Sequence, residues 1–324
     1  GCSRVSPGCD HCYAIRETNR HQNLPKYAGL VKKGVDSLEY PHDLVLEGTG
    51  EGRYHPELLD QPMHWNQPRR IFVCSMSDLF HDKVPWEFTC AVFDVMAACP
   101  QHTFQVLTKR PGRMAFFANV VYPEHFNFGH SPGNDFRGRG MQHYALGAMH
   151  GARTWPSNVW AGTSVESQKY APRIDCLLRV PAKVRFVSAE PVLGPLDLKP
   201  WFFQCSGCVP TPENPVCACK GLAIHQVIVG GESGPGARPM HPEWVRSLRD
   251  QCQAAGASFF FKQWGAWLPV NDLAKSDFDR HIATAIVTED GTQVSTWPGA
   301  YNRDRPRVMA RVGKKAAGAL LDGR

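Results

Sequence analysis

The chain has 324 residues, which is enough to bury one barrel-sized core or two smaller ones. Hydrophobic residues make up 43% of it, and no apolar run reaches the roughly 18 residues that a membrane-spanning helix needs, so we expect no membrane partner. The net charge of +6 suits an anionic partner. The 12 cysteines are clustered, which argues against a disulfide scaffold and favours metal ligation in a cytoplasmic protein.

The N-terminal stretch GCSRVSPGCDHC places three cysteines, Cys2, Cys9 and Cys12, on one loop. Its glycines and proline favour a tight loop over a helix or a strand. Three thiolates can ligate three irons of a 4Fe–4S cluster and leave the fourth iron open for chemistry. The same cysteines together with His11 would instead suit a structural zinc ion. The loop alone favours neither metal, and a helix over 13–23 is expected to follow it.

Short apolar segments alternate with helical patterns along most of the chain. The expected strands are 71–73, 104–107, 159–161, 184–187, 227–229 and 258–261. Helical patterns cover 86–99 and 242–255, the second with Pro242 at its start and Gly256 at its end. This alternation predicts repeated βα units with a parallel sheet. Polar residues follow each strand directly, which is typical of an active-site rim at the carboxyl ends of barrel strands.

Two segments interrupt the alternation. Residues 119–158 interleave aromatic and basic side chains, which suits nucleic-acid contact through stacking and phosphate pairing, although a surface insertion packed by its own aromatics would look similar. The residues concerned are Phe126, Phe128, Phe136, Arg137, Arg139, Tyr144, Arg153 and Trp155. The second segment, 201–222, is rich in cysteine. Four thiolates there suit a tetrahedral zinc site, with an auxiliary iron–sulfur cluster as the alternative. They are Cys205, Cys208, Cys217 and Cys219.

The opening GCSRVSPGCDHCYA resembles that of the phage-type three-cysteine family of radical S-adenosylmethionine (radical SAM) enzymes, found in bacteriophages and bacteria. The resemblance continues through FVCSMSDLFHD, FQVLTKRPGRM, VWAGTSVES, VRFVSAEPVLGPLDL, VIVGGESGPGARPM, FFFKQWG and VGKKAAGALLDG, and so spans nearly the whole chain. The spacing Cys-x6-Cys-x2-Cys departs from the Cys-x3-Cys-x2-Cys of the superfamily at large. The resemblance implies an α/β fold, a partial (β/α)6 TIM-type barrel with parallel strands over 1–268, with the cysteine loop at its top. A small C-terminal extension, 269–324, would follow, with Thr292–Trp297 as one arm of a hairpin after Asp290-Gly291.

The resemblance also implies a chemistry. Cys2, Cys9 and Cys12 would hold a 4Fe–4S cluster whose open iron binds S-adenosylmethionine, and an external electron donor such as flavodoxin would reduce it. Cleavage would then give methionine and a 5′-deoxyadenosyl radical that takes hydrogen from the substrate. The residues expected to bind S-adenosylmethionine are Tyr13, directly after Cys12, and, from their places after the strands, Ser75, Ser77, Asp78, Thr163, Ser164, Glu166, Ser188 and Glu190. The expected catalytic residues are Glu232 and Lys262.

The substrate that the resemblance suggests is a modified thymidine or other pyrimidine base in phage DNA, rearranged in an isomerase-type reaction in the bacterial cytoplasm. A radical SAM enzyme that acts on a small molecule is one alternative. The other is a zinc-stabilised nucleic-acid-binding protein without catalytic activity, with zinc in both cysteine groups. Colour separates these classes, because 4Fe–4S proteins are brown and zinc proteins are colourless.

Overall fold

The computed structural model describes residues 4–21, 23, 59–124, 153–204, 221–269, 284–288, 290, 293–295 and 307–322. Cys2, most of the predicted basic insertion and the four cysteines of the second group lie outside these residues. The chain divides into two compact units. Unit 1 comprises Gly1–Val5, Ala14–Thr163 and Asp175–Arg185, and unit 2 comprises Ser6–Tyr13, Ser164–Ile174 and Phe186–Arg324.

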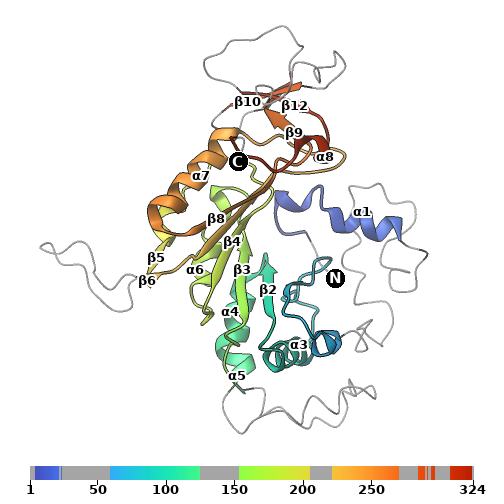
Figure 1. The fold of residues 1–324 in the computed structure, drawn as a ribbon, viewed down its shortest axis with the longest axis vertical. Helices are drawn as coiled ribbons and strands as arrows, with labels where there is room; N and C mark the ends of the chain where they lie inside the picture. Colours follow the sequence, from blue (N-terminus) through green and yellow to red (C-terminus); the bar gives the residue numbers. More distant parts are fainter. Residues whose placement is uncertain are drawn as a thin grey trace, which may run out of the picture. The chain divides into compact units, whose positions relative to one another are not determined.

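A six-stranded sheet carries the fold, with its strands in the order β1-β2-β3-β4-β7-β8. Figure 1 labels β2, β3, β4 and β8 of this sheet. The strands are β1 (Arg70–Val73), β2 (Thr103–Thr108), β3 (Val159–Ser164), β4 (Arg185–Ala189), β7 (Gln226–Gly230) and β8 (Ser258–Gln263). β1 pairs with β2, β2 with β3, β4 with β7 and β7 with β8, each in parallel. Parallel strands that follow one another in chain order have the topology of a partial TIM-type barrel. The expected mixed α/β class and all six predicted strands are therefore confirmed.

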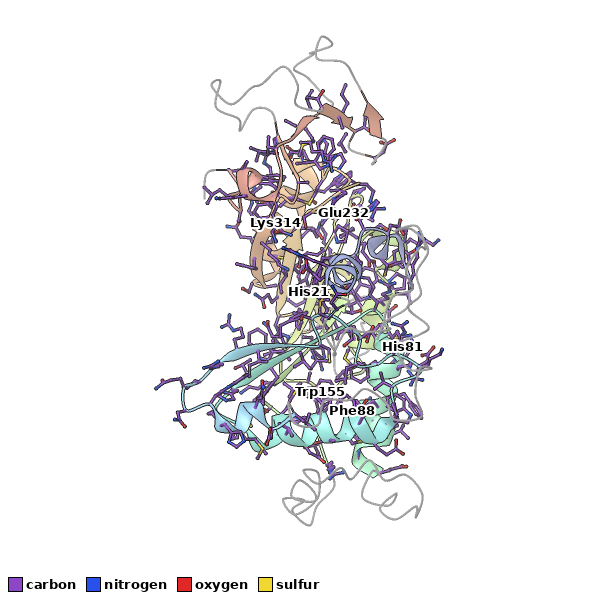
Figure 2. The ribbon with its side chains drawn as sticks, turned by 90° about the vertical axis from the view of Figure 1, so that its right-hand side faces the viewer. His21, His81, Phe88, Trp155, Glu232 and Lys314 are labelled. Carbon is purple, nitrogen blue, oxygen red and sulfur yellow. The ribbon has the colours of Figure 1, made fainter. Side chains whose placement is uncertain are left out.

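Unit 1 has an aromatic core beside the helix α3 (Trp86–Ala98). The ring of Phe93 lies 4.7 Å from that of Phe117 and 4.8 Å from that of Trp155. Trp155 is only 6% exposed, and its indole N–H donates to the Val159 carbonyl oxygen at 2.8 Å. Figure 2 shows Trp155 beside α3, the helix that carries Phe88. Trp155 therefore packs the core of unit 1 and does not form part of the predicted nucleic-acid surface.

The helical run that follows β2 extends into the predicted insertion. It consists of α4 (Pro111–Phe116), a π-helical turn (Phe117–Val121) and α5 (Tyr122–Glu124). Arg153, expected to contact phosphate, instead pairs with Asp94 on α3 at 3.0 Å and lies over the Tyr122 ring. Since both members of this pair are mostly buried, Arg153 also serves the packing of unit 1.

In unit 2 the helix α7 (Pro242–Ala255) packs against β7 and β8 (Figure 1). Its buried face includes Trp244, Val245 and Leu248. The Glu243 N–H donates to His241 Nδ1 at 3.1 Å, and Gly256 ends the helix in the left-handed region with φ of 74°. These caps confirm the predicted start and end of the helix.

A second sheet of unit 2 is antiparallel, in the order β11-β10-β12-β9. Its strands are β9 (Trp267–Pro269), β10 (Thr284–Val287), β11 (Gln293–Ser295) and β12 (Arg307–Arg311), and α8 (Lys314–Ala317) follows. β10 and β11 form the predicted hairpin. Arg246 and Arg249 of α7 both bind the carboxylate of Asp322, which fastens the segment after α8 to α7.

Two short strands near the ends of the predicted cysteine-rich insertion pair with each other. β5 (Phe203–Gln204) pairs antiparallel with β6 (Gly221–Leu222), with Gln204 opposite Gly221. The remaining short elements are η1 (Pro7–Cys9), α1 (Tyr13–Arg20), η3 (Gln61–His64), η7 (Gln168–Tyr170), α6 (Arg173–Leu177) and η8 (Lys199–Trp201). Among the described residues, no helix has the length and apolar character to cross a membrane.

Candidate functional site

The loop from Ser6 to Cys12, which we call the cysteine loop, is shaped by two consecutive tight turns. The Cys9 N–H donates to the Ser6 carbonyl oxygen at 2.9 Å, and the Cys12 N–H donates to the Cys9 carbonyl oxygen at 3.3 Å. Pro7 opens the first turn, η1, because its fixed φ suits the start of a helical turn. Cys9 is buried at 8% exposure, whereas Cys12 is half-buried. The predicted tight loop is confirmed for this part.

Glu166, two residues beyond β3, anchors one end of the cysteine loop. Its carboxylate is fully buried and accepts from the Ser6 hydroxyl at 2.7 Å and from Arg173 Nη1 at 2.9 Å. The loop backbone lies directly on this side chain, because a Cβ added at Gly8 would stand 2.5 Å from Glu166 Cγ. A buried carboxylate needs such partners to offset its desolvation. In these contacts Glu166 holds the loop, and its expected role toward S-adenosylmethionine stays a prediction.

Glu232, two residues beyond β7, anchors the middle of the loop through Arg238 (Figure 2 labels Glu232). The guanidinium of Arg238 binds both Glu232 carboxylate oxygens, at 2.7 and 2.9 Å. It also donates to the Pro7 carbonyl oxygen at 2.8 Å and to Asp10 Oδ2 at 3.4 Å. Burial acts to lower the pKa of Arg238, but the hydrogen bonds and charge of Glu232 outweigh it and raise that pKa. Arg238 is thus a permanent cation, and Glu232 is engaged with it.

A third contact fixes the loop near Cys12. Gly236 has φ of +73°, and a Cβ added there would lie 2.7 Å from His11 Cε1. Only glycine gives both the left-handed backbone and the room for the imidazole. The backbone of the segment after β7 is thereby complementary in shape to the cysteine loop.

A separate ion pair joins Glu190, directly after β4, to Lys262, near the end of β8. Lys262 Nζ lies 3.2 Å from Glu190 Oε2, which also accepts from the Ser188 hydroxyl at 3.3 Å. Lys262 is 51% exposed at its side chain, in contrast to Arg173 and Arg238. The backbone also lies close to this pair, since a Cβ added at Gly230, the last residue of β7, would stand 2.4 Å from Glu190 Oε1. Three of the predicted site residues, Ser188, Glu190 and Lys262, thus form one cluster, and the Lys262 side chain in it is exposed to solvent.

Unit 1 has its own network, around Asp78 in the loop after β1. Oδ1 accepts from the Phe80 N–H at 3.0 Å and the Thr108 hydroxyl at 2.7 Å, and Oδ2 accepts from the Lys109 N–H at 3.2 Å and Arg110 Nη1 at 3.0 Å. This carboxylate therefore ties the loop after β1 to the end of β2. Its predicted contact with an ammonium group stays a prediction.

Other predicted residues of unit 1 have structural contacts as well. The Thr163 hydroxyl donates to the Thr108 carbonyl oxygen at 2.9 Å, and the Ser77 N–H donates to the Cys74 carbonyl oxygen at 3.1 Å. Ser75 lies in the same turn. In unit 2, the Ser164 carbonyl oxygen accepts from Arg173 at 2.9 Å, and Tyr13 is exposed at the start of α1.

Sequence reasoning found the carboxylates but missed the arginines that neutralise them. Arg110, Arg173 and Arg238 each pair with a carboxylate that is almost completely buried. The available signal was indirect: a carboxylate that follows a buried strand requires a cationic partner nearby. Across the described ranges, no three histidine, cysteine or acidic side chains are grouped as metal ligands. Cys2, the third member of the predicted trio, lies outside those ranges.

The fold and this arrangement define an α/β protein with a cysteine loop bound at the carboxyl ends of parallel strands. Residues 1–324 match the family described as "Protein of unknown function (DUF5131)", and the chain belongs to that family. No curated protein matches the sequence, and no solved structure matches it either.

Proposed function

We propose that this protein is a radical SAM enzyme whose cluster is held by Cys2 and by Cys9 and Cys12 of the cysteine loop. One observation carries the proposal: within unit 2, the loop bearing Cys9 and Cys12 is bound to Glu166 and, through Arg238, to Glu232, directly beyond the carboxyl ends of β3 and β7. The carboxyl ends of parallel barrel strands are where such folds place their active sites. A zinc ion with a purely structural role would not require this position.

Two of the three proposed cluster ligands, Cys9 and Cys12, lie among the described residues. Cys2, Cys9 and Cys12 would hold the iron–sulfur cluster, and the turn that ends at Cys9 keeps two of these cysteines on one short, braced segment. Such a cluster, when it binds S-adenosylmethionine, supplies an electron for reductive cleavage to methionine and a 5′-deoxyadenosyl radical. The protein's own contribution is to orient the loop through Glu166 and Arg238.

Glu190 and Lys262 are suited to contact a polar group of the cofactor or the substrate. They lie at strand ends in the same unit as the cysteine loop, and the Lys262 ammonium is exposed enough to donate to a bound molecule. In this proposal Lys262 touches the substrate, whereas Glu232 acts through Arg238 and positions the loop.

The finer features of the proposal follow the sequence. They are six complete βα units, a modified pyrimidine base in phage DNA as the substrate, an electron donor such as flavodoxin, a cytoplasmic location and zinc or a second cluster at Cys205, Cys208, Cys217 and Cys219. The net charge of +6 supports an anionic substrate. Arg137 and Arg139 lie outside the described residues, so the nucleic-acid surface is proposed from the sequence pattern alone.

The test is anaerobic reconstitution with iron and sulfide, followed by reductant and S-adenosylmethionine. We expect a brown protein that forms 5′-deoxyadenosine, detected by mass spectrometry. Replacing Cys2, Cys9 and Cys12 together with Ala should abolish the product, because these are the proposed iron ligands. Cys99→Ala serves as the control, since Cys99 is buried after α3 in unit 1. A colourless zinc protein, or product from the triple variant, contradicts the proposal.

A further inference from the structure

Arg238 joins the segment after β7 to the cysteine loop through a single guanidinium group. Its Nη2 atom binds Glu232 at 2.7 Å and the Pro7 carbonyl oxygen at 2.8 Å, while Nη1 reaches Asp10 at 3.4 Å. Pro7 and Asp10 flank Cys9 in the sequence. One planar guanidinium group therefore contacts the loop on both sides of a proposed ligand. A lysine would place its charge at a single point and could not reproduce this fork.

The segment that carries Arg238 is braced independently of the loop. The Arg238 N–H donates to Glu232 Oε2 at 2.8 Å, and the Trp267 indole N–H donates to the Ala237 carbonyl oxygen at 2.6 Å. Arg311 donates to the Gly234 carbonyl oxygen at 3.1 Å. The last two bonds come from β9 and β12, and none of the three involves the cysteine loop. Arg238 is thus oriented before it contacts the loop.

The other end of the loop is held by Ser6. Its hydroxyl donates to Glu166 and stands 4.0 Å from Cys9 Sγ. With the Gly236–His11 contact, three separate points of unit 2 meet the segment from Ser6 to Cys12. All of them are contacts between protein atoms.

We infer that Arg238 is a positioning residue that holds the cysteine loop in its ligating conformation before any metal binds. The identity of the metal rests on the proposed function, but the preformed loop does not. Glu232 and the braced segment set the direction of the guanidinium, and the guanidinium sets the position of Cys9. Metal binding then requires little ordering of the chain, and ordering is the usual cost of building a metal site.

The test measures thiol reactivity in the metal-free, full-length protein. Brief alkylation with iodoacetamide and peptide mass spectrometry gives a separate rate for Cys9 and for Cys12. Cys252 is the internal reference, because burial raises its pKa to about 12 and keeps it inert in the folded chain. Arg246→Gln is the matched control, since Arg246 also binds two carboxylates in unit 2 but has no described contact with the loop.

In the wild type we expect Cys9 to react more slowly than Cys12. In Arg238→Gln, Cys9 should react about tenfold faster or more, because several hydrogen bonds to a charged group are lost. Cys252 in that variant, and every thiol in Arg246→Gln, should keep wild-type rates. If Cys252 in Arg238→Gln also reacts faster, that variant has unfolded, and the milder variant Arg238→Lys is measured instead. Faster alkylation of Cys9, with Cys252 unchanged, in Arg238→Lys supports the inference. An unchanged Cys9 rate in both Arg238 variants overturns it.

A second measurement separates this inference from the proposed function. After anaerobic reconstitution, Arg238→Gln should hold less iron per chain and lose it faster to a chelator than the wild type and Arg246→Gln do. If the wild type takes up no iron, the proposed function fails, and the alkylation rates still decide the role of Arg238. If iron binds normally and Cys9 stays protected in both variants, the proposed function stands, and the positioning role is wrong.

Discussion

Each unit contains a buried carboxylate that is paired with an arginine, and the two pairs make different further contacts. In unit 1 the described donors to Asp78 come from its own loop, from Thr108 at the end of β2 and from the two residues that follow. In unit 2 Arg238 satisfies Glu232 and still donates to Pro7, 231 positions earlier in the chain. The first network stabilises a strand connection. The second also extends its hydrogen bonds to a loop with candidate ligands, and that difference points to function.

The largest effect should come from breaking the Asp78 network of unit 1. Asp78→Ala leaves the buried Arg110 without its carboxylate and removes the acceptor of three further donors. We expect a loss of about 3–5 kcal/mol in the free energy of unfolding, as for other buried pairs that lose one member. Chemical denaturation measures it. In the folded fraction, Cys9 should keep its slow alkylation rate, and a change of less than about 1 kcal/mol would contradict the network's structural role.

A smaller effect should follow from Gly236→Ala, which tests how closely the loop fits unit 2. The new Cβ would meet the His11 ring at 2.7 Å, and the backbone there has φ of +73°. Gly256→Ala is the matched control, with φ of +74° and nothing within 4 Å of the added Cβ. We expect about 1 kcal/mol of destabilisation for Gly256→Ala from the backbone alone. Gly236→Ala should cost about 2 kcal/mol or more, because the clash with His11 adds to the same strain.

Thiol alkylation sharpens this comparison. Gly236→Ala should also speed the reaction of Cys12, the neighbour of His11, whereas Gly256→Ala should leave it unchanged. Equal stability and equal reactivity of the two variants would show that the loop does not press on Gly236 in solution.

The smallest effect concerns Asp322, a surface counterpart of the buried pairs. Hydrogen bonds from Arg246, and then from Arg249, hold its pKa below the ordinary value of 3.8. Because the folded pKa is lowered, the resulting stabilisation is present above the ordinary pKa and is lost as the pH falls through the lowered one. Asp322 is 37% exposed, so solvent screening keeps the contribution below about 1 kcal/mol.

Urea unfolding of the wild type and of Asp322→Asn over a pH series tests this. The wild type should be slightly more stable at neutral pH, and its advantage should shrink below a pH of about 4. A difference that is constant over the whole series would show that Asp322 acts through packing and not through its charge.

The sequence predicted the parallel sheet well because its strands are continuous apolar runs such as Val227–Val229. Burial of both faces of a parallel sheet requires such runs, so the signal is local. The helix over 242–255 was equally clear, since proline and glycine mark its two ends. The small antiparallel sheet was harder: β9 begins at Trp267, within the range assigned to the barrel, and pairs with β12 about 40 positions later. Nothing in three residues of sequence indicates that partner.

The candidate site was predicted only in part, because the sequence shows which residues follow strands but not which residues they contact. Polar residues after strands are visible in the sequence, and Glu166, Glu190 and Glu232 do lie at strand ends in unit 2. Their partners are not visible, because Ser6 meets Glu166 at a separation of 160 residues and has no periodic pattern. For Arg153 and Trp155 the prediction was wrong, because it placed two core-packing residues on a nucleic-acid surface. An arginine and an aromatic residue in a glycine-rich segment suggested a surface, but Asp94 and Phe93 on α3 supply a buried partner for each.

The short β5–β6 ladder has a consequence for how this chain can vary. Gln204 and Gly221 stand opposite each other, so everything between them begins and ends at one point beside the parallel sheet. With its ends already joined, such a segment adds only about 0.6 kcal/mol of closure entropy for each doubling of its length. We therefore expect insertions or deletions there to leave the β4–β7 register unchanged. The ladder therefore makes the length of the segment between Gln204 and Gly221 largely independent of the rest of unit 2.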